Sequence, residues 1–221
     1  MPDLTCPIES FPELETLAPV RAVFLKKVAG LDVSTDRETA LQRLKSMHEA
    51  TLANEGFTIS HLARAEQVHG NGVAIVHKNT PMLSPGCDAL VTTDRDIGLG
   101  IYVADCAAVY IADRHGRGIA LAHSGRKGTE LGIVPKTIET LCHAVGCDPS
   151  DLVLQISPCI RPPHYEIDFA SEIQRQATTA GVRDILDSFR CTASHPKEYY
   201  SYRLEKGRTG RLLAAMRWQG A

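Results

Sequence analysis

The sequence has no excess of basic residues. Its 221 residues include 24 lysines and arginines against 26 aspartates and glutamates, which gives a formal net charge of -2. Proteins that hold nucleic acid or acidic lipid non-specifically need a clear positive excess, because lysine and arginine must neutralise the phosphates. The composition therefore argues against a general affinity for nucleic acid or for a membrane surface. Small molecules are the expected partners.

A long apolar run is also absent. No stretch reaches the roughly 20 apolar residues that a membrane span requires, and residues 1–19 carry acids and prolines where a secretory signal has a basic segment followed by an apolar one. The seven cysteines are an odd number spread over the chain, which fits reduced thiols better than a disulfide framework. We therefore expect a cytoplasmic protein that does not contact a membrane.

What remains is the composition of an ordinary folded protein. Apolar residues make up 43% of the chain and charged residues 23%, so composition gives no argument for disorder. The length allows one core, or one core with an elaboration. We expect a single domain over residues 1–221, in which residues 1–19 form an irregular N-terminal segment.

Apolar runs and turn residues alternate along the chain. A strand over 20–28 precedes a helix over 36–56, where Asp36 is placed to cap the helix and Gly56 to end it. Further predicted strands cover 73–77, 88–92, 97–105, 107–113, 118–123, 151–158 and 210–218, and further helices cover 134–146 and 168–181. This order of elements predicts an α+β fold without repeats or linkers.

Three reactive side chains stand at predicted strand ends. His69 lies in "QVHG", Cys106 in "VADCAAV" and His123 in "LAHSGRKG". Residues at strand ends can converge although they are distant in sequence, and rigid scaffolds often position functional groups in this way. The gaps of 37 and 17 residues contain no short motif such as CxxC or HExxH that would fix the geometry locally. On spacing alone, a buried structural cysteine and two structural histidines remain an open alternative.

Six segments of the sequence agree, in order, with one known family. They are "EQVHG", "DALVT", "VADCAAVYIAD", "IALAHSGRKG", "SPCIRPPHYEI" and "RCTASHPKEYYSYRLEKGRTGRLLAAMRW". Together they resemble the laccase-domain family, also called multicopper polyphenol oxidoreductase-like, which includes the peptidoglycan editing factor and zinc-dependent purine nucleoside phosphorylases. The resemblance extends from about Gln67 to Trp218.

The resemblance implies both a fold and a site. Members of the family fold as a three-layer α/β/α domain around a central mixed β-sheet. Their matching residues imply that His69, Cys106 and His123 bind zinc and take part in catalysis here. The implied activities are phosphorolysis of adenosine, inosine and methylthioadenosine, a transferase reaction, and deamination of adenosine, a hydrolase reaction. Two imidazoles and one thiolate leave a fourth tetrahedral position for a reactant, as in catalytic zinc sites.

The sequence also departs from the family pattern. Where the family has AHAGWRG this chain has "AHSGRKG", so Ser124, Arg126 and Lys127 replace Ala, Trp and Arg, and Ala108 replaces a proline. These changes beside the ligands suggest an altered substrate preference. We expect Arg126, Lys127 and backbone N–H groups of a turn between Gly125 and Gly128 to hold phosphate. The alternative is a solvated basic loop without a ligand.

Other residues are assigned to the same pocket on weaker patterns. Ser124 and Cys159 are expected to contact substrate, with a packing role as the alternative for Cys159. Tyr165 and Arg203 are expected at its border. Asp105 is given only a supporting role, because a regular strand would turn it away from Cys106.

Four other functions stay open at this point. Cys106 with His69 or His123 as base would make a metal-free hydrolase, amidase-like and suited to editing peptidoglycan precursors. Copper-dependent oxidation of polyphenols is disfavoured by the lack of a blue-copper ligand set or a second histidine cluster. A non-catalytic member would bind a nucleotide or a protein partner. Nucleic acid binding through the basic run at residues 203–211 is the fourth, but that run is more simply a solvated turn before the last strand. The oligomeric state is not predicted.

Overall fold

The strands form two mixed sheets that lie face to face. The computed structural model describes residues 5–220. In the first sheet the order is β1 (Ile8–Ser10), β2 (Val20–Leu25), β12 (Leu212–Trp218), β7 (Gly98–Val103), β3 (Leu62–Ala65) and β5 (Leu83–Ser84). In the second it is β11 (Asp184–Asp187), β10 (Leu152–Ile156), β8 (Ala107–Asp113), β9 (Ile119–Ser124), β6 (Ala89–Thr92) and β4 (Val73–Ile75).

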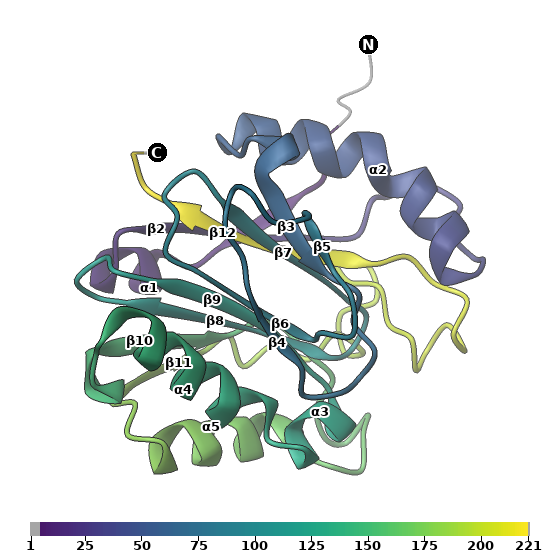
Figure 1. Cartoon of the computed structure of the whole chain (residues 1–221). Helices are drawn as coiled ribbons and strands as arrows, with labels where there is room; N and C mark the ends of the chain where they lie inside the picture. Colours follow the sequence, from purple (N-terminus) through teal and green to yellow (C-terminus); the bar gives the residue numbers. More distant parts are fainter. Residues whose placement is uncertain (1–4, 221) are drawn as a thin grey trace.

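The longer helices cover the outer faces of this pair of sheets, and the short first helix packs against a strand of each sheet. The helices are α1 (Pro12–Leu17), α2 (Arg37–Asn54), α3 (Arg126–Glu130), α4 (Ile133–Val145) and α5 (Phe169–Thr179), with 3-10 turns at Ile59–His61 and Pro149–Asp151. Helix α2 lies outside the first sheet, and α4 and α5 lie outside the second (Figure 1). The predicted α+β fold, with helices on both sides of mixed β-structure, is confirmed. The strands between the helices divide into two sheets where one central sheet was expected.

Strand β8 shows why the sheets stack in this way. Its residues are buried on both faces: Ala108, Tyr110 and Ala112 pack toward the first sheet, while the alternate residues pack toward α4 and α5. Because successive side chains of a strand point to opposite faces, a continuous apolar run of this kind belongs in the middle of a layered structure. The Tyr110 hydroxyl donates to the Val23 carbonyl at 2.8 Å and so links the two sheets.

The expectation of an irregular segment over residues 1–19 is wrong for its described part. Residues 8–10 form β1 and pair with β2, and residues 12–17 form α1, which begins with Pro12 at its first position. Proline is well tolerated there because its missing N–H would have had no partner within the helix. Glu15 of α1 also pairs with Arg21 at 2.9 Å. These short elements lack the length that gives a readable periodicity.

The main predicted elements are found close to their expected bounds. The Asp36 carboxylate accepts from the Thr39 backbone N–H at 3.0 Å and caps α2 as predicted. The pattern missed the strands β3, β5 and β11 and the helix α3, which are two to five residues long. None of the described helices combines the length and the apolar character that crossing a bilayer requires.

Candidate metal centre between the two sheets

Two neighbouring strands of the second sheet position Cys106 and His123. Strand β8 begins one residue after Cys106, and His123 is the fifth residue of β9 and lies opposite Ala108 of β8. On β9, Ile119 and Leu121 face the first sheet, so His123 projects to that same side. Antiparallel pairing thus brings the thiol and the imidazole together at one end of the sheet. The glycine that follows β9 makes room for them, since a Cβ on Gly125 would lie 2.4 Å from the Cys106 sulfur.

His69 reaches the same place from the loop between β3 and β4, which passes from the first sheet to the second. Its backbone is left-handed, with φ at 58°. A histidine in this region carries a conformational cost that its surroundings must offset. Asp88 supplies that support, because its carboxylate accepts from the His69 N–H at 2.9 Å and from the Gly70 N–H at 2.7 Å.

The Asp88 carboxylate also fixes the ring of His123. It lies 2.8 Å from His123 Nδ1 and is fully buried. Burial alone would raise the pKa of Asp88, but the hydrogen bonds from His123, Gly70 and His69 lower it below its ordinary value. An ionised Asp88 therefore holds the proton on Nδ1 and turns Nε2 toward Cys106. Carboxylate partners behind ligand histidines do the same in metal sites.

The charges of Cys106 and His123 depend on each other. Burial opposes ionisation of the Cys106 thiol, but hydrogen bonds with His123 and His69 outweigh it and lower the pKa of Cys106 to about 6. Burial likewise opposes the charged form of His123, yet Asp88 and Cys106 raise its pKa to about 9. A thiolate is thus favoured at neutral pH. The thiolate is the form of cysteine that binds metals or attacks an electrophile.

The donor atoms of the three side chains converge. The ligand atoms of His69, Cys106 and His123 all lie within 4.8 Å of one another, and the two imidazole rings meet edge to face with centroids 4.8 Å apart. Two nitrogens and one sulfur are ligands that Zn²⁺ prefers, and three protein ligands are typical of zinc sites that keep a position open. The residues present therefore fit a zinc ion. The predicted convergence of His69, Cys106 and His123 is confirmed.

A cavity of about 550 Å³ opens above these three residues. Its size suits a small organic ligand. Its apolar and aromatic walls come from Tyr102, Val103, Ala104, Ile160, Tyr165, Phe169 and Tyr202. Its cationic side chains are Arg37, Arg126, Arg203, Lys206 and Arg211. Tyr165 and Arg203 border the site as predicted, and the Arg203 guanidinium lies 5.4 Å from the centre of the Tyr165 ring.

Asp105 has a larger part in the site than the sequence suggested. The strand does not stay regular there, because β7 ends at Val103 and Asp105 has a left-handed backbone with φ at 80°. Its buried carboxylate accepts from Thr192 Oγ1 at 2.6 Å, Ser201 Oγ at 3.0 Å and the Arg203 N–H at 2.7 Å. Asp105 therefore anchors the C-terminal loop beside the turn that presents Cys106.

Gln67 supports the site from the other sheet. Its backbone is left-handed, and its side chain accepts from the Tyr102 N–H at 3.0 Å and donates to the Tyr102 carbonyl. The amide thus mimics one more strand residue beside β7. This pairing fixes the start of the loop that ends in His69.

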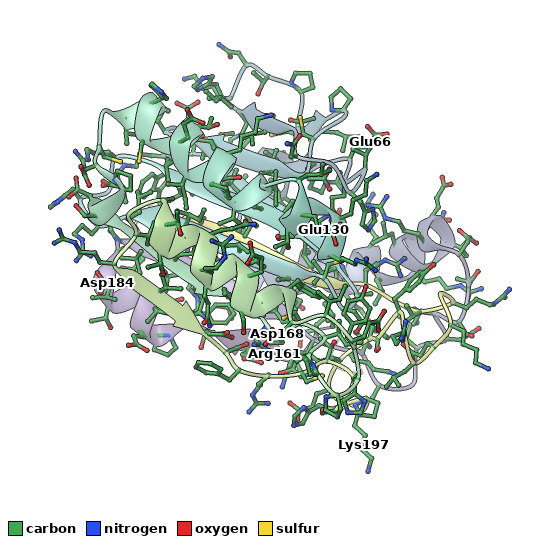
Figure 2. The ribbon with its side chains drawn as sticks, turned by 90° about the horizontal axis from the view of Figure 1, so that it is seen from below. Glu66, Glu130, Arg161, Asp168, Asp184 and Lys197 are labelled. Atoms are coloured by element: carbon green, nitrogen blue, oxygen red, sulfur yellow. The ribbon has the colours of Figure 1, made fainter. Side chains whose placement is uncertain are left out.

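The residues predicted to hold phosphate are largely elsewhere. Residues 126–130 form helix α3, so the expected turn between Gly125 and Gly128 is a helix start. Ser124 is fully buried and its hydroxyl lies 2.8 Å from that of Thr129, and Lys127 is exposed outside the cavity. Of these residues only Arg126 lines the cavity, and it pairs at 2.9 Å with Glu130. Figure 2 labels Glu130, the last residue of α3.

Cys159 does not reach the cavity either. It is fully buried among the residues that pack between the second sheet and its helices, and burial raises the pKa of its thiol to about 12. The packing alternative is therefore correct for Cys159, and a contact with substrate is not supported for Ser124 or Cys159.

Several residues at the site were not found by sequence reasoning. Asp88 had a signal, since it is an acid directly before a buried apolar run in "DALVT", but it was counted only as part of a strand. The cavity residues not predicted come from three segments that no local pattern connects: Arg37, Tyr102, and Tyr202, Lys206 and Arg211.

Comparison with known proteins agrees with this geometry. A sequence-family model described as "Multi-copper polyphenol oxidoreductase laccase" matches residues 22–173 and 164–219. The chain belongs to this family. A purine nucleoside phosphorylase of Deinococcus radiodurans is 31% identical over 214 residues, which cover 85% of this chain and 82% of that protein. The purine nucleoside phosphorylase Cgl2154/cg2365 of Corynebacterium glutamicum is 28% identical and covers 87% of this chain and 92% of that protein.

Solved structures of similar fold are also known. The crystal structure of YlmD from Geobacillus stearothermophilus matches with a TM-score of 0.78 and 24% identity, over 92% of this chain and 93% of that one. The Bacillus licheniformis protein YfiH matches with a TM-score of 0.81 and 19% identity, over 90% and 93% of the two chains. At these identities the similarity establishes the fold.

Proposed function

We propose that this protein is a zinc-dependent enzyme that acts on purine nucleosides. The observation that carries the proposal is the meeting of His69, Cys106 and His123 at the base of the cavity, in a chain whose relatives are named purine nucleoside phosphorylases. The proposed reaction is phosphorolysis of adenosine, inosine or methylthioadenosine. Deamination of adenosine is a proposed second activity of the same site.

The three side chains would hold the zinc through two ring nitrogens and one sulfur. When bound, zinc supplies a Lewis acid and leaves a coordination position for a reactant. The protein's own part is to keep the ligands in the form that binds. Asp88 retains the proton on His123 Nδ1, and the hydrogen bonds around Cys106 favour its thiolate.

The cavity walls suit a nucleoside. Four aromatic rings line the cavity and offer faces and edges against which a purine can stack: Tyr102, Tyr165, Phe169 and Tyr202. Contact between these rings and a bound purine would exclude water. In phosphorolysis a phosphate oxygen forms a bond to C1′ of the ribose while the bond from C1′ to the base breaks. The base leaves with the electron pair and takes up a proton, and the products are the free base and ribose 1-phosphate. Such a reaction needs cations for phosphate, and several line the cavity.

The free thiols support a proposed cellular location. All seven cysteines are free, which fits a reducing compartment. We place the proposed activity in the cytoplasm. A nucleoside and phosphate are the proposed partners.

Replacement of Cys106 tests the proposal. Purified wild-type protein is expected to contain stoichiometric zinc, measured by plasma mass spectrometry, and to release free base from inosine or adenosine in phosphate buffer. Cys106→Ala should lose the zinc and the turnover, because two imidazoles alone bind the ion weakly. Cys147→Ala, which changes a partly exposed thiol outside this cavity, is the matched control. Zinc retained by Cys106→Ala, copper in place of zinc, or no turnover of any purine nucleoside by the wild type would reject the proposal.

A metal-free hydrolase is the second candidate, because the contacts of Cys106 with both histidines resemble those of a thiol nucleophile and its base. The pKa of about 6 for Cys106 and the Asp88 partner of His123 favour it. Iodoacetamide distinguishes the two. Alkylation of Cys106 that added zinc prevents supports the metal enzyme, whereas inactivation unaffected by zinc supports the hydrolase.

A further inference from the structure

The cations of the cavity fall into two groups. Arg126 pairs with Glu130 at 2.9 Å and Arg203 pairs with Glu166 at 3.1 Å, so these two charges are balanced within the protein. Arg37, Lys206 and Arg211 form no ion pair with any carboxylate of the described residues 5–220. The cavity thus holds three cations without a counter-ion in the described part of the chain.

Arg211 is the most unusual of the three because it is buried. It is only 9% exposed, and the contacts of its Nη1 are with the carbonyls of Thr209 at 2.8 Å and Gly210 at 3.0 Å. A buried guanidinium without an ion-pair partner costs free energy, and perturbed groups of this kind cluster at functional sites. Burial lowers the pKa of Arg211, and the neighbouring charge of Arg37 lowers it further.

The fold places Arg211 next to the reactive end of the cavity. Arg211 immediately precedes β12, whose Leu212 pairs with Val103 of β7. Beyond Val103 the chain turns through Asp105 to Cys106, so Arg211 lies beside the turn that presents the thiol. Asp105 is the nearest acid on this turn, but Thr192, Ser201 and the Arg203 N–H already occupy its carboxylate. Asp105 and Cys106 act on Arg211 by charge alone, without an ion pair among the described residues, so a ligand anion can supply the direct contact that the guanidinium lacks.

We propose that Arg211 and Arg37, with Lys206 at the rim, form the site for a tetrahedral oxyanion, and that this anion is inorganic phosphate. This rests on the proposed function, since phosphate is the second substrate of phosphorolysis. Guanidinium groups suit the task because their N–H donors match pairs of phosphate oxygens. The proposed phosphate site thus lies at the start of β12 and not at the start of α3, where Arg126 forms an ion pair with Glu130.

A nucleotide could present the same chemistry through its 5′-phosphate group. The two sources differ in what else must fit, because a nucleotide would place its sugar and base in the cavity together with the anion. Binding of inorganic phosphate and of inosine 5′-monophosphate, each measured alone, separates them. Tighter binding of the free anion supports the proposal, and binding of the nucleotide alone overturns it.

The central test is phosphate affinity, measured by calorimetry on the zinc-loaded full-length protein. Arg211→Met should weaken binding of inorganic phosphate by at least about tenfold, the effect of losing one charge-assisted hydrogen-bond pair. Arg211→Lys should recover part of the loss, because it keeps the charge without the fork of donors. Arg208→Met is the matched control, since it removes an exposed arginine from the same loop outside the cavity.

Two exposed residues keep the test valid if Arg211→Met does not fold. Arg37→Met and Lys206→Met change side chains that contribute little to the core, and each should weaken phosphate binding severalfold. Unchanged phosphate affinity in these variants and in Arg211→Lys would overturn the proposal. So would a loss of phosphate binding in Arg126→Met that equals or exceeds the loss in Arg211→Met.

Kinetics separate this inference from the proposed function. If the wild type cleaves inosine and the KM for phosphate is the same in Arg211→Met, the inference fails while the proposed function stands. If the wild type binds phosphate through Arg211 but cleaves no nucleoside, the anion site stands and the proposed function fails. Where both hold, Arg211→Met should raise the KM for phosphate far more than the KM for inosine.

Discussion

At the scale of single residues, Asp88 connects the parts of the site. One buried carboxylate sets the backbone of His69 and the ring of His123, which belong to segments 54 residues apart in the sequence. Its hydrogen bond offsets the cost of the left-handed backbone at His69, and it selects the tautomer of His123. The ligand set therefore depends on a residue that does not itself belong to it, and this dependence can be measured.

Asp88→Asn should weaken zinc binding by roughly 10- to 100-fold, the range found for partners of ligand histidines. Asp88 Oδ1 faces both the His69 N–H and His123 Nδ1, and Oδ2 accepts from the Gly70 N–H, so an NH₂ group at either position opposes a donor. At the Oδ1 position it would also shift the His123 ring proton to Nε2, away from the form that binds metal. Chelator competition on the purified variant measures the affinity. Asp148→Asn, which changes an exposed acid that caps a 3-10 turn, is the control. Equal zinc affinity in Asp88→Asn and wild type would show that Asp88 does not orient the ligands.

At the scale of elements, the sequence was informative wherever a long apolar run was buried on both faces. Strands β7, β8 and β9 were predicted for this reason, helix α4 through its single apolar face, and α2 through its Asp36 cap. Short elements such as β3 and β5 depend on pairing with distant strands, which leaves no local pattern.

Helix α2 also contains a buried histidine that periodicity did not reveal. His48 is 2% exposed, its ring stacks on Tyr102 at 5.9 Å, and neither ring nitrogen has a hydrogen-bond partner among residues 5–220.

His48 predicts a pH-dependent stability. Burial lowers its pKa to about 4, below the ordinary value of 6.5, so the unfolded chain binds a proton more readily than the folded protein. The free energy of unfolding is therefore not reduced by His48 above about pH 6.5. It falls as the pH drops from there toward 4, because only the unfolded chain binds the proton in that range. Between about pH 7.5 and about pH 5 the expected loss is about 2 kcal/mol.

Urea unfolding of wild type and His48→Phe at these two pH values measures that loss. Phenylalanine keeps a ring against Tyr102 but cannot titrate. Between these two pH values, the free energy of unfolding should therefore fall by about 2 kcal/mol less in His48→Phe than in wild type. The other titrating groups are shared and cancel in the comparison. Parallel pH dependence in the two proteins would mean that His48 is not held neutral by burial.

At the scale of the whole molecule, the site exists because two sheets meet. The second sheet contributes Cys106 and His123, and the loop that passes between the sheets contributes His69. Strand ends of the first sheet contribute Gln67, after β3, and Arg211, before β12. Sequence spacing alone left the three ligands unconnected, and only the resemblance to a family brought them together. The turn expected between Gly125 and Gly128 is a helix start, because a glycine-flanked basic segment looks alike in sequence whether it stays a loop or starts a helix. Burial of Arg211 cannot be read from its neighbours in sequence.

The X-ray absorption spectrum of the purified protein at the zinc edge tests the central claim most directly. We predict bound zinc whose shell contains one sulfur and two imidazole nitrogens at ordinary Zn–S and Zn–N distances of about 2.3 and about 2.0 Å, with the sulfur signal lost in Cys106→Ala. A zinc shell without sulfur, or a wild-type protein that retains no zinc, would contradict the account.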